Sequence, residues 1–482
     1  MYRRNDKEQL EFENFHLPFG GHLKSDNRWV KLAKIIPWDE LEEKYAGLFS
    51  DRMGAPAKTF RMALGALIIK ERLNITDEET VEQIRETPYL QYLIGFHEYQ
   101  DKVPFNPSMM VHFRKRLSPE IMARINDVII NGKLKKDDHD DFNDRNDTED
   151  KEISVNEEEF NSGIMMVDAS VAPSDIAYPT DLSLLNKSRE KLEEIIDALY
   201  EPLKGTAQKP RTYRQKARVA YLRVAKQRKS SQKAIGKAIK QQLQYVKRDL
   251  GHVVTLGNLE SLSSRLYKNL LVIQEIFRQQ QEMYQKNIHS TSDRIVNISQ
   301  PHVRPIVRGK ASAAVEFGAK IMVSRINGYH VLEDISWDNV NEATLLQKQI
   351  ERYRERMGCY PEAVLADKLY RNRDNITFCK DRNIRLSGPK LGRPGKERQA
   401  DKRQERADCA MRNAIEGSFG TGKRRYSLAR IMMKLRETSE TSISLIVLVM
   451  NLEKILKDII INFFNRCFRI QKWYFLKKFR AA

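Results

Sequence analysis

The prediction of a sheet in this protein depends on the stretch Gly163-Ile-Met-Met-Val-Asp-Ala-Ser-Val-Ala-Pro173. Its short apolar run ends at Pro173, a pattern typical of a buried strand. Asp168 directly follows the apolar residues 164–167. A carboxylate in such a strand loses hydration, which is costly unless the group is paired or binds a metal. The stretch therefore predicts a buried strand, with Asp168 as a candidate functional acid.

The sequence after residue 295 predicts the rest of a mixed α/β layer. Residues 319–326 and 329–336 flank Asn327-Gly328, a strong signal for a type I′ hairpin. The other elements are expected as a helix at 342–357, a strand at 361–367, a helix at 371–383, a short strand at 384–387, and helices from about 407 and at 439–464. Together with the first strand, this order indicates an α/β fold with a hairpin at its edge.

Changes in periodicity and charge along the chain predict its domain organisation. Residues 1–135 have helical periodicity and form an all-α N-terminal domain. Residues 136–162 are acidic and are expected to be a flexible linker. A catalytic domain is expected at 163–464, interrupted by a long helical insertion at about 182–295. Residues 465–482 form a basic C-terminal tail.

A basic helix in the N-terminal domain is a candidate for contact with DNA. Thr76 begins a capping-box signature, and Ser108 is placed to cap the helix that follows it. This second helix carries the consecutive cations Arg114, Lys115 and Arg116. Short helices with tight turns and one basic helix suit a helix-turn-helix-like DNA reader. A plain helical bundle accounts for these features equally well.

Composition excludes several classes of protein. The chain has 482 residues, of which 41% are hydrophobic, so it can form cores and is not disordered overall. Its four cysteines have no CxxC or zinc spacing, which argues against a disulfide scaffold and fits a reducing compartment. The first residues lack an apolar signal core, and the longest apolar run, Ile443–Met450, is too short to span a bilayer. We therefore expect a cytoplasmic protein without a membrane segment.

The formal net charge of +19 is concentrated in two segments. Residues 206–248 contain fourteen Lys and Arg and no acid, and residues 465–482 contain six more, again without an acid. Residues 137–159 have the opposite character, with twelve acids. A single charge run is usually a solvated helix face, but two acid-free basic segments favour a polyanionic partner. Nucleic acid is the expected partner, with ribosomal or membrane-surface association as the alternatives.

Three acids are placed where they can do chemistry together. Asp168 lies on the first strand, Asp367 closes the apolar run 363–366, and Glu416 follows Arg412 in a helical stretch. Oxygen ligands of this kind suit Mg²⁺. A pair of ions about 4 Å apart would activate a nucleophile and stabilise the leaving 3′ oxygen of a phosphodiester. Taken singly, each acid has a plainer explanation: a turn former or cap for each Asp, and an i, i+4 surface pair for Arg412 and Glu416.

At these residues the sequence resembles a known family, the DDE-class insertion-sequence transposases of bacteria. Within the insertion-sequence-five superfamily it is most similar to the eleven-eighty-two-like group, which has a long helical insert. The family's signature is Tyr, two residues, Arg, three residues, Glu, six residues and Lys; Arg412, Glu416 and Lys423 match it. Cys409 stands at the Tyr position, a departure that touches no metal ligand. The other similar segments are 106–108, 113–117, 178–186, 300–310, 315–320, 366–373 and 386–389.

The resemblance implies a fold, a reaction and a set of roles. The fold is an RNase H-like mixed-sheet core in which Asp168, Asp367 and Glu416 are the catalytic acids and hold Mg²⁺, as two ions for which Mn²⁺ substitutes. The protein would bind the terminal inverted repeats of a mobile element as a homo-oligomer on double-stranded DNA, at the nucleoid. Activated water would cut the DNA, and the exposed 3′ hydroxyl would attack target DNA. Arg412 and Lys423 would hold phosphates near the scissile bond, and the basic segment 206–248 would follow the DNA backbone.

Two other functions stay open at this point. A transposase that has lost catalysis and acts as a DNA-binding regulator would not need all three acids. A host RNase H-like nuclease or junction resolvase would share the metal chemistry but would not need the long N-terminal helical domain. Strand joining in the presence of Mg²⁺ distinguishes these possibilities.

Overall fold

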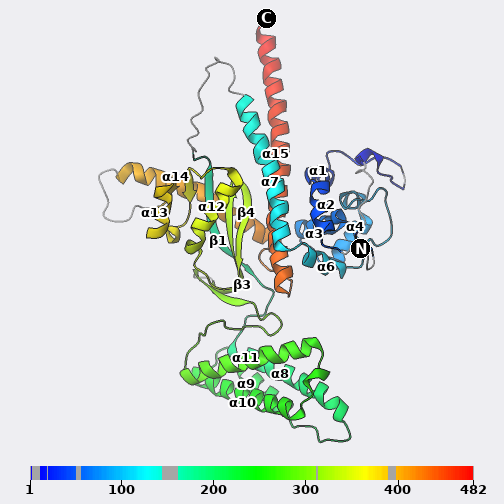
Figure 1. Cartoon of the computed structure of the whole chain (residues 1–482), viewed down its shortest axis with the longest axis vertical. Coiled ribbons are helices and arrows are strands. Elements are labelled where there is room, and N and C mark those ends of the chain that lie inside the picture. The colour runs from blue at the N-terminus through cyan, green and yellow to red at the C-terminus, as the bar shows by residue number, and fades with distance from the viewer. Residues whose placement is uncertain are drawn as a thin grey trace.

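The computed structural model describes residues 2, 11–18, 20–49, 56–143, 161–310, 313–388 and 398–480. These residues form a mixed α/β molecule with the sheet in the middle, N-terminal helices beside it and a separate layer of helices below (Figure 1). The predicted acidic linker begins inside a helix, because α7 (Pro119–Asn143) continues into it, and its residues 144–160 lie outside the described part of the chain.

The described residues before the sheet are mainly helical. Their helices are α1 (Arg28–Ile35), α2 (Trp38–Ala46), α3 (Phe60–Leu73), α4 (Asp77–Glu86), α5 (Pro88–Leu93), α6 (Met109–Arg116) and α7. The predicted cap Thr76 is confirmed, because its hydroxyl accepts a hydrogen bond from the backbone N–H of Glu79. Ser108 stands at the N-cap position of α6 as predicted, but its side chain makes no cap bond, and its N–H donates to Oδ1 of Asn106.

The sheet has six strands in the described part of the chain. They are β1 (Ile164–Pro173), β2 (Arg304–Lys310), β3 (Ala313–Ile326), β4 (Tyr329–Ser336), β5 (Ala363–Leu365) and β6 (Arg385–Leu386). Strand β3 pairs antiparallel with β1, β2 and β4, whereas β5 pairs parallel with both β1 and β6. The predicted hairpin is confirmed, because Asn327 and Gly328 at its turn have φ values of 49° and 84°.

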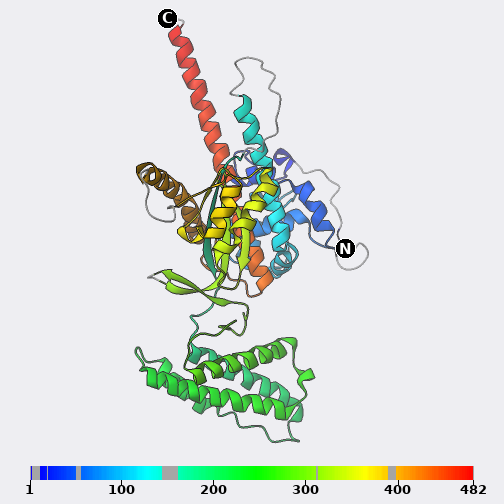
Figure 2. The same cartoon turned by 60° about the vertical axis from the view of Figure 1, so that its left-hand side comes forward.

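Strand β2 was not predicted from the sequence. It pairs with the first half of β3, from Arg304 opposite Gly318 to Lys310 opposite Ala313, while β4 pairs with the second half. A glycine is required at position 318 of β3, since a Cβ there would lie 2.2 Å from the carbonyl oxygen of Ala172 on β1. The long strand β3 thus connects the hairpin edge of the sheet to β2, which lies on the side of the insertion (Figure 2).

The helices that follow the hairpin pack around the sheet. They are η4 (Glu342–Leu345), α12 (Leu346–Met357), η5 (Lys368–Tyr370), α13 (Arg373–Asp381), α14 (Arg398–Arg425) and α15 (Arg436–Arg480). The predicted helices at 342–357 and 371–383 are confirmed within a few residues. Helix α14 begins at Arg398 rather than at about 407, so the third candidate acid lies well inside a long helix.

Helix α15 joins the N-terminal helices to the sheet. It packs against α3, α6, α7 and β4, and it lies beside α7 in Figures 1 and 2. Its residues Ile443–Met450 are in the core. Asn451 is fully buried and donates to the backbone oxygen of His330 on β4 and to Oδ1 of Asn126 on α7. A single hydrophobic cluster therefore includes the N-terminal helices, the sheet and α15.

The insertion between β1 and β2 forms a helical unit with its own core. It consists of α8 (Asp181–Tyr200), η2 (Glu201–Leu203), α9 (Arg214–Ala225), α10 (Gln232–Leu256), η3 (Leu259–Ser261) and α11 (Ser264–Lys286). Its buried apolar side chains form a second cluster, distinct from that around the sheet. Thr180 and Ser183 form a reciprocal capping box at its start. Asp181, the first residue of α8, binds Arg294 and Gln280, at 2.6 and 2.7 Å.

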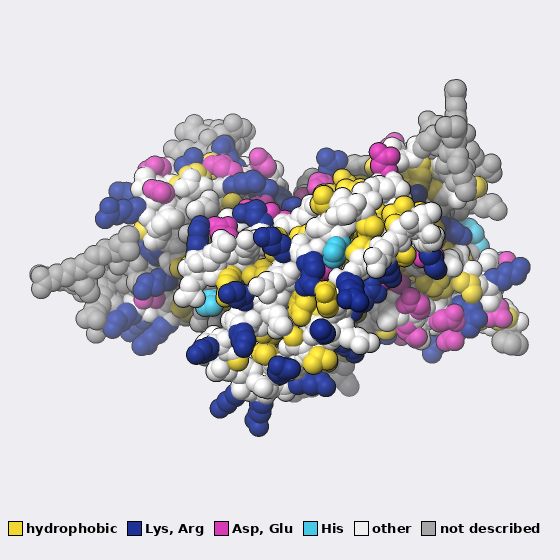
Figure 3. Space-filling model, turned by 90° about the horizontal axis from the view of Figure 1, so that it is seen from below, with side chains coloured by type: hydrophobic (Ala, Val, Ile, Leu, Met, Phe, Trp, Pro, Cys, Tyr) yellow, Lys and Arg dark blue, Asp and Glu magenta, His cyan; other side chains and the backbone are white. Residues whose placement is uncertain are grey.

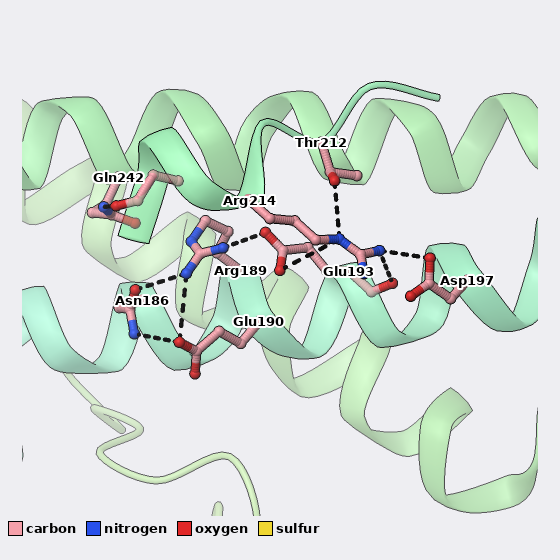
Figure 4. A network of polar contacts seen from close by, with 9 residues as sticks. Asn186, Arg189, Glu190, Glu193, Asp197, Thr212, Arg214 and Gln242 are labelled. Carbon is pink, nitrogen blue, oxygen red and sulfur yellow. Dashed lines mark hydrogen bonds and ion pairs between the residues drawn. The ribbon is translucent and has the colours of Figure 1, made fainter. Parts of the chain in front are cut away.

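A polar network joins the helices inside the insertion (Figure 4). Arg189 on α8 is buried and binds Glu193 and Asn186 of the same helix. Arg214, the first residue of α9, reaches back to Asp197 and to the backbone oxygen of Glu193, at 2.5 and 3.1 Å. Since buried ionic groups need such partners, the network fixes where α9 lies against α8.

Candidate active site

The first two candidate acids meet because their strands are neighbours and parallel. Met166 on β1 is level with Leu365 on β5. Asp168 and Asp367 each lie two residues beyond this pair, so both acids come to the same end of the sheet. Asp367 follows β5 directly and caps η5, with Oδ1 accepting from the N–H of Lys368 at 2.6 Å. The sheet topology thus brings together two residues that are separated by almost two hundred positions.

The third acid comes from α14, which packs against β1 and β5. Arg412 and Glu416 are one helical turn apart. The guanidinium of Arg412 binds the carboxylates of both Glu416 and Asp367. Its Nη1 lies 3.1 Å from Oδ1 of Asp367, and its Nη2 lies 3.3 Å from Oε1 of Glu416. The two carboxylates are half-exposed, at 49% and 51%. Arg412 therefore connects Asp367, at the end of β5, to Glu416 on α14.

Asp168 is the most buried member of this group of acids. The pKa of its carboxyl is raised to about 6, chiefly by burial and to a lesser degree by the charges of Glu416 and Asp367. The N–H of Ala169, which donates to Asp168 at 2.8 Å, and the charge of Arg412 both act to lower this pKa. A carboxylate held among like charges and partly out of water is one that a cation would stabilise.

A cavity of about 750 Å³ opens over the three acids. Arg412, Phe419, Gly420 and Lys423 of α14 line it, together with Glu416. These positions recur at helical spacing, so they share one face of the helix. The matching signature positions Arg412, Glu416 and Lys423 are thus brought to one wall, opposite the strand acids.

Two other residues of the cavity region were missed from the sequence. Lys320 on β3 lines the cavity and binds the backbone oxygen of Val340 at 2.7 Å and the carboxylate of Glu342. Tyr370 has a buried hydroxyl without a hydrogen-bond partner in the described part of the chain. Burial raises its pKa above the usual value, and the charges of Glu342, Asp168 and Asp367 act in the same direction. The short spacing from Asp367 to Tyr370 was the available signal.

The N-terminal candidates are not equivalent. Arg114 is only 3% exposed and binds the carboxylate of Asp77, with Nη1 at 3.0 Å from Oδ1. This burial removes Arg114 from contact with a phosphate in the present arrangement. Arg116 is half-buried, with its guanidinium 4.6 Å from the ring centre of Phe49. Lys115 is exposed and is the member of this run that faces solvent.

Cys409 and Gly422 show how α14 is fitted around the site. Cys409, at the signature Tyr position, is exposed with a free thiol one turn before Arg412. At Gly422, an added Cβ would lie 3.0 Å from Leu428 and 3.2 Å from Met450 of α15. A larger residue there would push the helix away, so this glycine permits close packing just before Lys423.

The donor set suits a divalent cation, although the present arrangement is not that of a bound ion. Three carboxylates from β1, η5 and α14 are the hard oxygen ligands that Mg²⁺ prefers. In the described residues, no group of three His, Cys, Asp or Glu is close enough to hold a metal ion as placed. The guanidinium of Arg412 lies between Asp367 and Glu416 and supplies the positive charge. Binding of a cation by these acids thus requires Arg412 to move.

One negative finding concerns membranes. Among the described residues, every helix is too short or too polar to cross a lipid bilayer.

Comparison with known proteins links this site to a family. The family described as transposase DDE domain matches residues 364–453, and the transposase domain DUF772 matches residues 18–116. An uncharacterised protein, ORF8 of the nfe locus of Rhizobium meliloti, is 31% identical over 163 residues, which are 34% of this chain and 70% of the relative. No solved structure matched. Asp367, Arg412 and Glu416 all lie in the matched DDE segment, and the chain belongs to the transposases that carry these two domains.

Proposed function

We propose that this protein is an insertion-sequence transposase that binds the terminal inverted repeats of its element, cuts the DNA and joins it to a target. The observation that carries the proposal is the meeting of Asp168, Asp367 and Glu416 at one cavity whose other wall carries Arg412 and Lys423. Acids supply cation ligands and basic groups supply phosphate contacts, so the two walls suit a phosphodiester. The protein would act as a homo-oligomer on double-stranded DNA.

The topology supports an RNase H-like core. The order β4-β3-β1-β5-β6 places three antiparallel strands beside two parallel ones. The first acid lies on β1, and the second follows its parallel neighbour β5. This arrangement agrees with the placement of acids that the resemblance implied. Membership of the insertion-sequence-five superfamily, and of the eleven-eighty-two-like group within it, is part of the same proposal.

The roles of the residues follow from their positions. Asp168, Asp367 and Glu416 would hold Mg²⁺, or Mn²⁺ in its place, and the bound ions would activate water and stabilise the leaving 3′ oxygen. Arg412 would exchange its two carboxylates for a phosphate as DNA enters, because a guanidinium binds phosphate oxygens in the same bidentate way. Lys423, on the same wall, would hold the next phosphate. Lys115 on α6 is the N-terminal cation available for the element end.

The test is a reaction with labelled DNA that carries the ends of the element, in Mg²⁺, compared with Asp367→Asn. We expect the wild type to cut and to join strands, and the variant to bind the ends without forming product. Cutting without joining would favour an RNase H-like nuclease. Binding of the ends with no Mg²⁺-dependent product from the wild type would show a transposase-derived regulator and would overturn the catalytic proposal.

A further inference from the structure

One face of the helical insertion is covered by cations that have no acidic partners. Apart from Lys209, which lies 2.8 Å from Asp197, the exposed Lys and Arg of the acid-free segment are Arg211, Lys216, Arg218, Arg223, Lys226, Arg228, Lys229, Lys233, Lys237, Lys240 and Lys247. None of them forms an ion pair within the described part of the chain. Figure 3, which views the molecule from the side of the insertion, shows Lys and Arg gathered on this unit. We call this set, on α9, α10 and the loops beside them, the basic face.

The cations elsewhere on the insertion are different. On α11, Arg278 binds Glu275 and Glu282, and Lys286 binds Glu282 at 2.7 Å. Arg265 lies 3.5 Å from Glu194 of α8. These three cations are therefore partly neutralised by neighbouring acids, unlike the cations of the basic face.

The basic face is unfavourable for the isolated protein. Lys233, Lys237 and Lys240 are spaced three and four residues apart on α10, and like charges at this spacing destabilise a helix by a few tenths of a kcal/mol per pair. No acidic side chain in the described part of the chain pairs with these three lysines. A polyanion on this surface would relieve their repulsion and would release counterions in doing so.

Buried contacts hold the basic face in a fixed shape. Gln242 of α10 is buried and donates to the backbone oxygen of Ala217 on α9, at 3.2 Å. Arg214 ties the start of α9 to α8 through Asp197. Helices α9 and α10 are thus positioned before any ligand arrives. Binding would therefore not cost the entropy of ordering the backbone that carries these cations.

Aromatic rings at the edge of this face are already engaged by cations. The guanidinium of Arg248 lies 4.7 Å from the ring centre of Tyr213 and 5.0 Å from that of Tyr245. Lys216 lies 5.7 Å from the ring of Tyr213. Rings held in this way are poorly placed to stack on bases, so the surface is suited to backbone phosphates and not to unpaired bases.

From these observations we infer that the basic face binds the backbone of duplex DNA outside the catalytic cavity and without sequence preference. The inference rests on the proposed function, since that function makes DNA the polyanion. From Lys233 to Lys247, α10 rises about 21 Å, which matches about six base pairs of duplex at 3.4 Å each. The insertion begins directly after β1, the strand that carries Asp168, so DNA held on this face is linked to the active site through a short connection.

Neutralising three cations of this face tests the inference. The full chain carrying Lys233→Gln, Lys237→Gln and Lys240→Gln is compared with a control carrying Arg265→Gln, Arg278→Gln and Lys286→Gln, which changes the net charge equally within the same unit. Anisotropy titrations of a random-sequence 30-base-pair duplex are made over a range of salt concentrations. We expect at least a tenfold loss of affinity for the first variant and a fall of about two to three in its log–log salt slope. The control should stay within threefold of wild type.

The outcomes separate this inference from the proposed function. Equal losses in both triple variants, or an unchanged slope in the first, would overturn the inference even if the protein transposes. Preferential binding of the basic face to single-stranded RNA or to anionic lipid vesicles would also overturn it. If the first variant alone loses duplex affinity while the wild type forms no cleavage product, the inference stands and the catalytic proposal fails. Thermal unfolding of both variants shows whether either loss comes from misfolding.

Discussion

Arg412 is the residue on which the state of the site depends. Its guanidinium occupies the space between Asp367 and Glu416, at 3.1 and 3.3 Å, and acts as their counter-charge. A cation that binds these acids must therefore compete with the positive side chain of Arg412, which lies on the same helix as Glu416. This competition would keep the acids neutralised until phosphate draws Arg412 away.

The first prediction concerns Arg412→Met. Without the guanidinium, the acids lack a counter-charge, so we expect the protein free of DNA to bind Mn²⁺ about tenfold more tightly, equivalent to about 1.4 kcal/mol. Cleavage should nevertheless fall, because a phosphate contact is lost. Calorimetric titration with Mn²⁺ measures the affinity. Arg430→Met, which removes an arginine that binds Asp175 at 2.7 Å, is the control. Unchanged or weaker binding of Mn²⁺ by Arg412→Met would contradict the competition.

The parts of the site that were predicted correctly are those whose residues lie close together in the sequence. Arg412, Glu416 and Lys423 share one helix face, and their spacing alone indicated this. The burial of Arg114 was not predictable, because its partner Asp77 lies 37 residues away on another helix. Tyr370 was missed because its short spacing from Asp367 does not by itself show that its ring is enclosed near the acids.

At the scale of elements, the helical insertion contains a buried carboxylate that affects its stability. Asp249 on α10 is fully buried, and neither carboxylate oxygen has a hydrogen-bond partner in the described residues. Burial and then the charge of Glu193 raise its pKa to about 7, against the opposing charges of Arg248, Arg189 and Arg214. The folded state thus keeps a proton that the unfolded chain loses near pH 4.

The second prediction is a pH dependence of the insertion. Because the folded-state pKa of Asp249 is the higher one, the free energy of unfolding falls as pH rises from about 4 to about 7. Asp249→Asn should remove most of this slope and stabilise the unit at pH 8, by on the order of 3 kcal/mol. Thermal unfolding followed by circular dichroism from pH 5 to pH 8 measures it. Asp197→Asn, which removes a carboxylate paired with Arg214 and Lys209, should instead destabilise the unit. A lower midpoint for Asp249→Asn at pH 8 would refute the assignment.

Element prediction succeeded and failed for identifiable reasons. The hairpin at Asn327-Gly328 was predicted because the turn residues require positive φ, which is a local property. Strand β2 was missed because Arg304–Lys310 contains a proline and three cations, and only its pairing with β3 makes it a strand. The start of α14 was placed too late, because its first turns are polar and carry no apolar periodicity.

At the scale of the whole molecule, α15 is the element that makes the N-terminal helices and the sheet one body. Ser442 donates to Glu71 of α3, and Thr441 donates to the backbone oxygen of Arg114 on α6. Asn451 contacts β4 and α7 from the same helix. The insertion has a core of its own and takes no part in these contacts. The chain therefore consists of a joined body and an appended helical unit.

The third prediction concerns Asn451→Ala. This change leaves buried partners on β4 and α7 without their hydrogen bonds, so it should cost about 3 kcal/mol in the free energy of unfolding. The loss should appear in the transition of the joined body and not in that of the insertion, when unfolding is followed by calorimetry. Asn462→Ala, an exposed position on the same helix, is the control and should stay within about 0.5 kcal/mol of wild type. A simultaneous shift of both transitions would contradict the division into two units.

We propose that Asp168, Asp367 and Glu416 act together on DNA. The most direct test is the single-turnover rate of cleavage at an element end in Mg²⁺ and in Mn²⁺. The three variants are Asp168→Asn, Asp367→Asn and Glu416→Gln. Asp374→Asn, an exposed acid on α13, is the control. We expect each of the three to lose at least a thousandfold in rate while binding the end as the wild type does, and the control to cleave normally. Cleavage by any one of them within tenfold of the wild-type rate would contradict the claim.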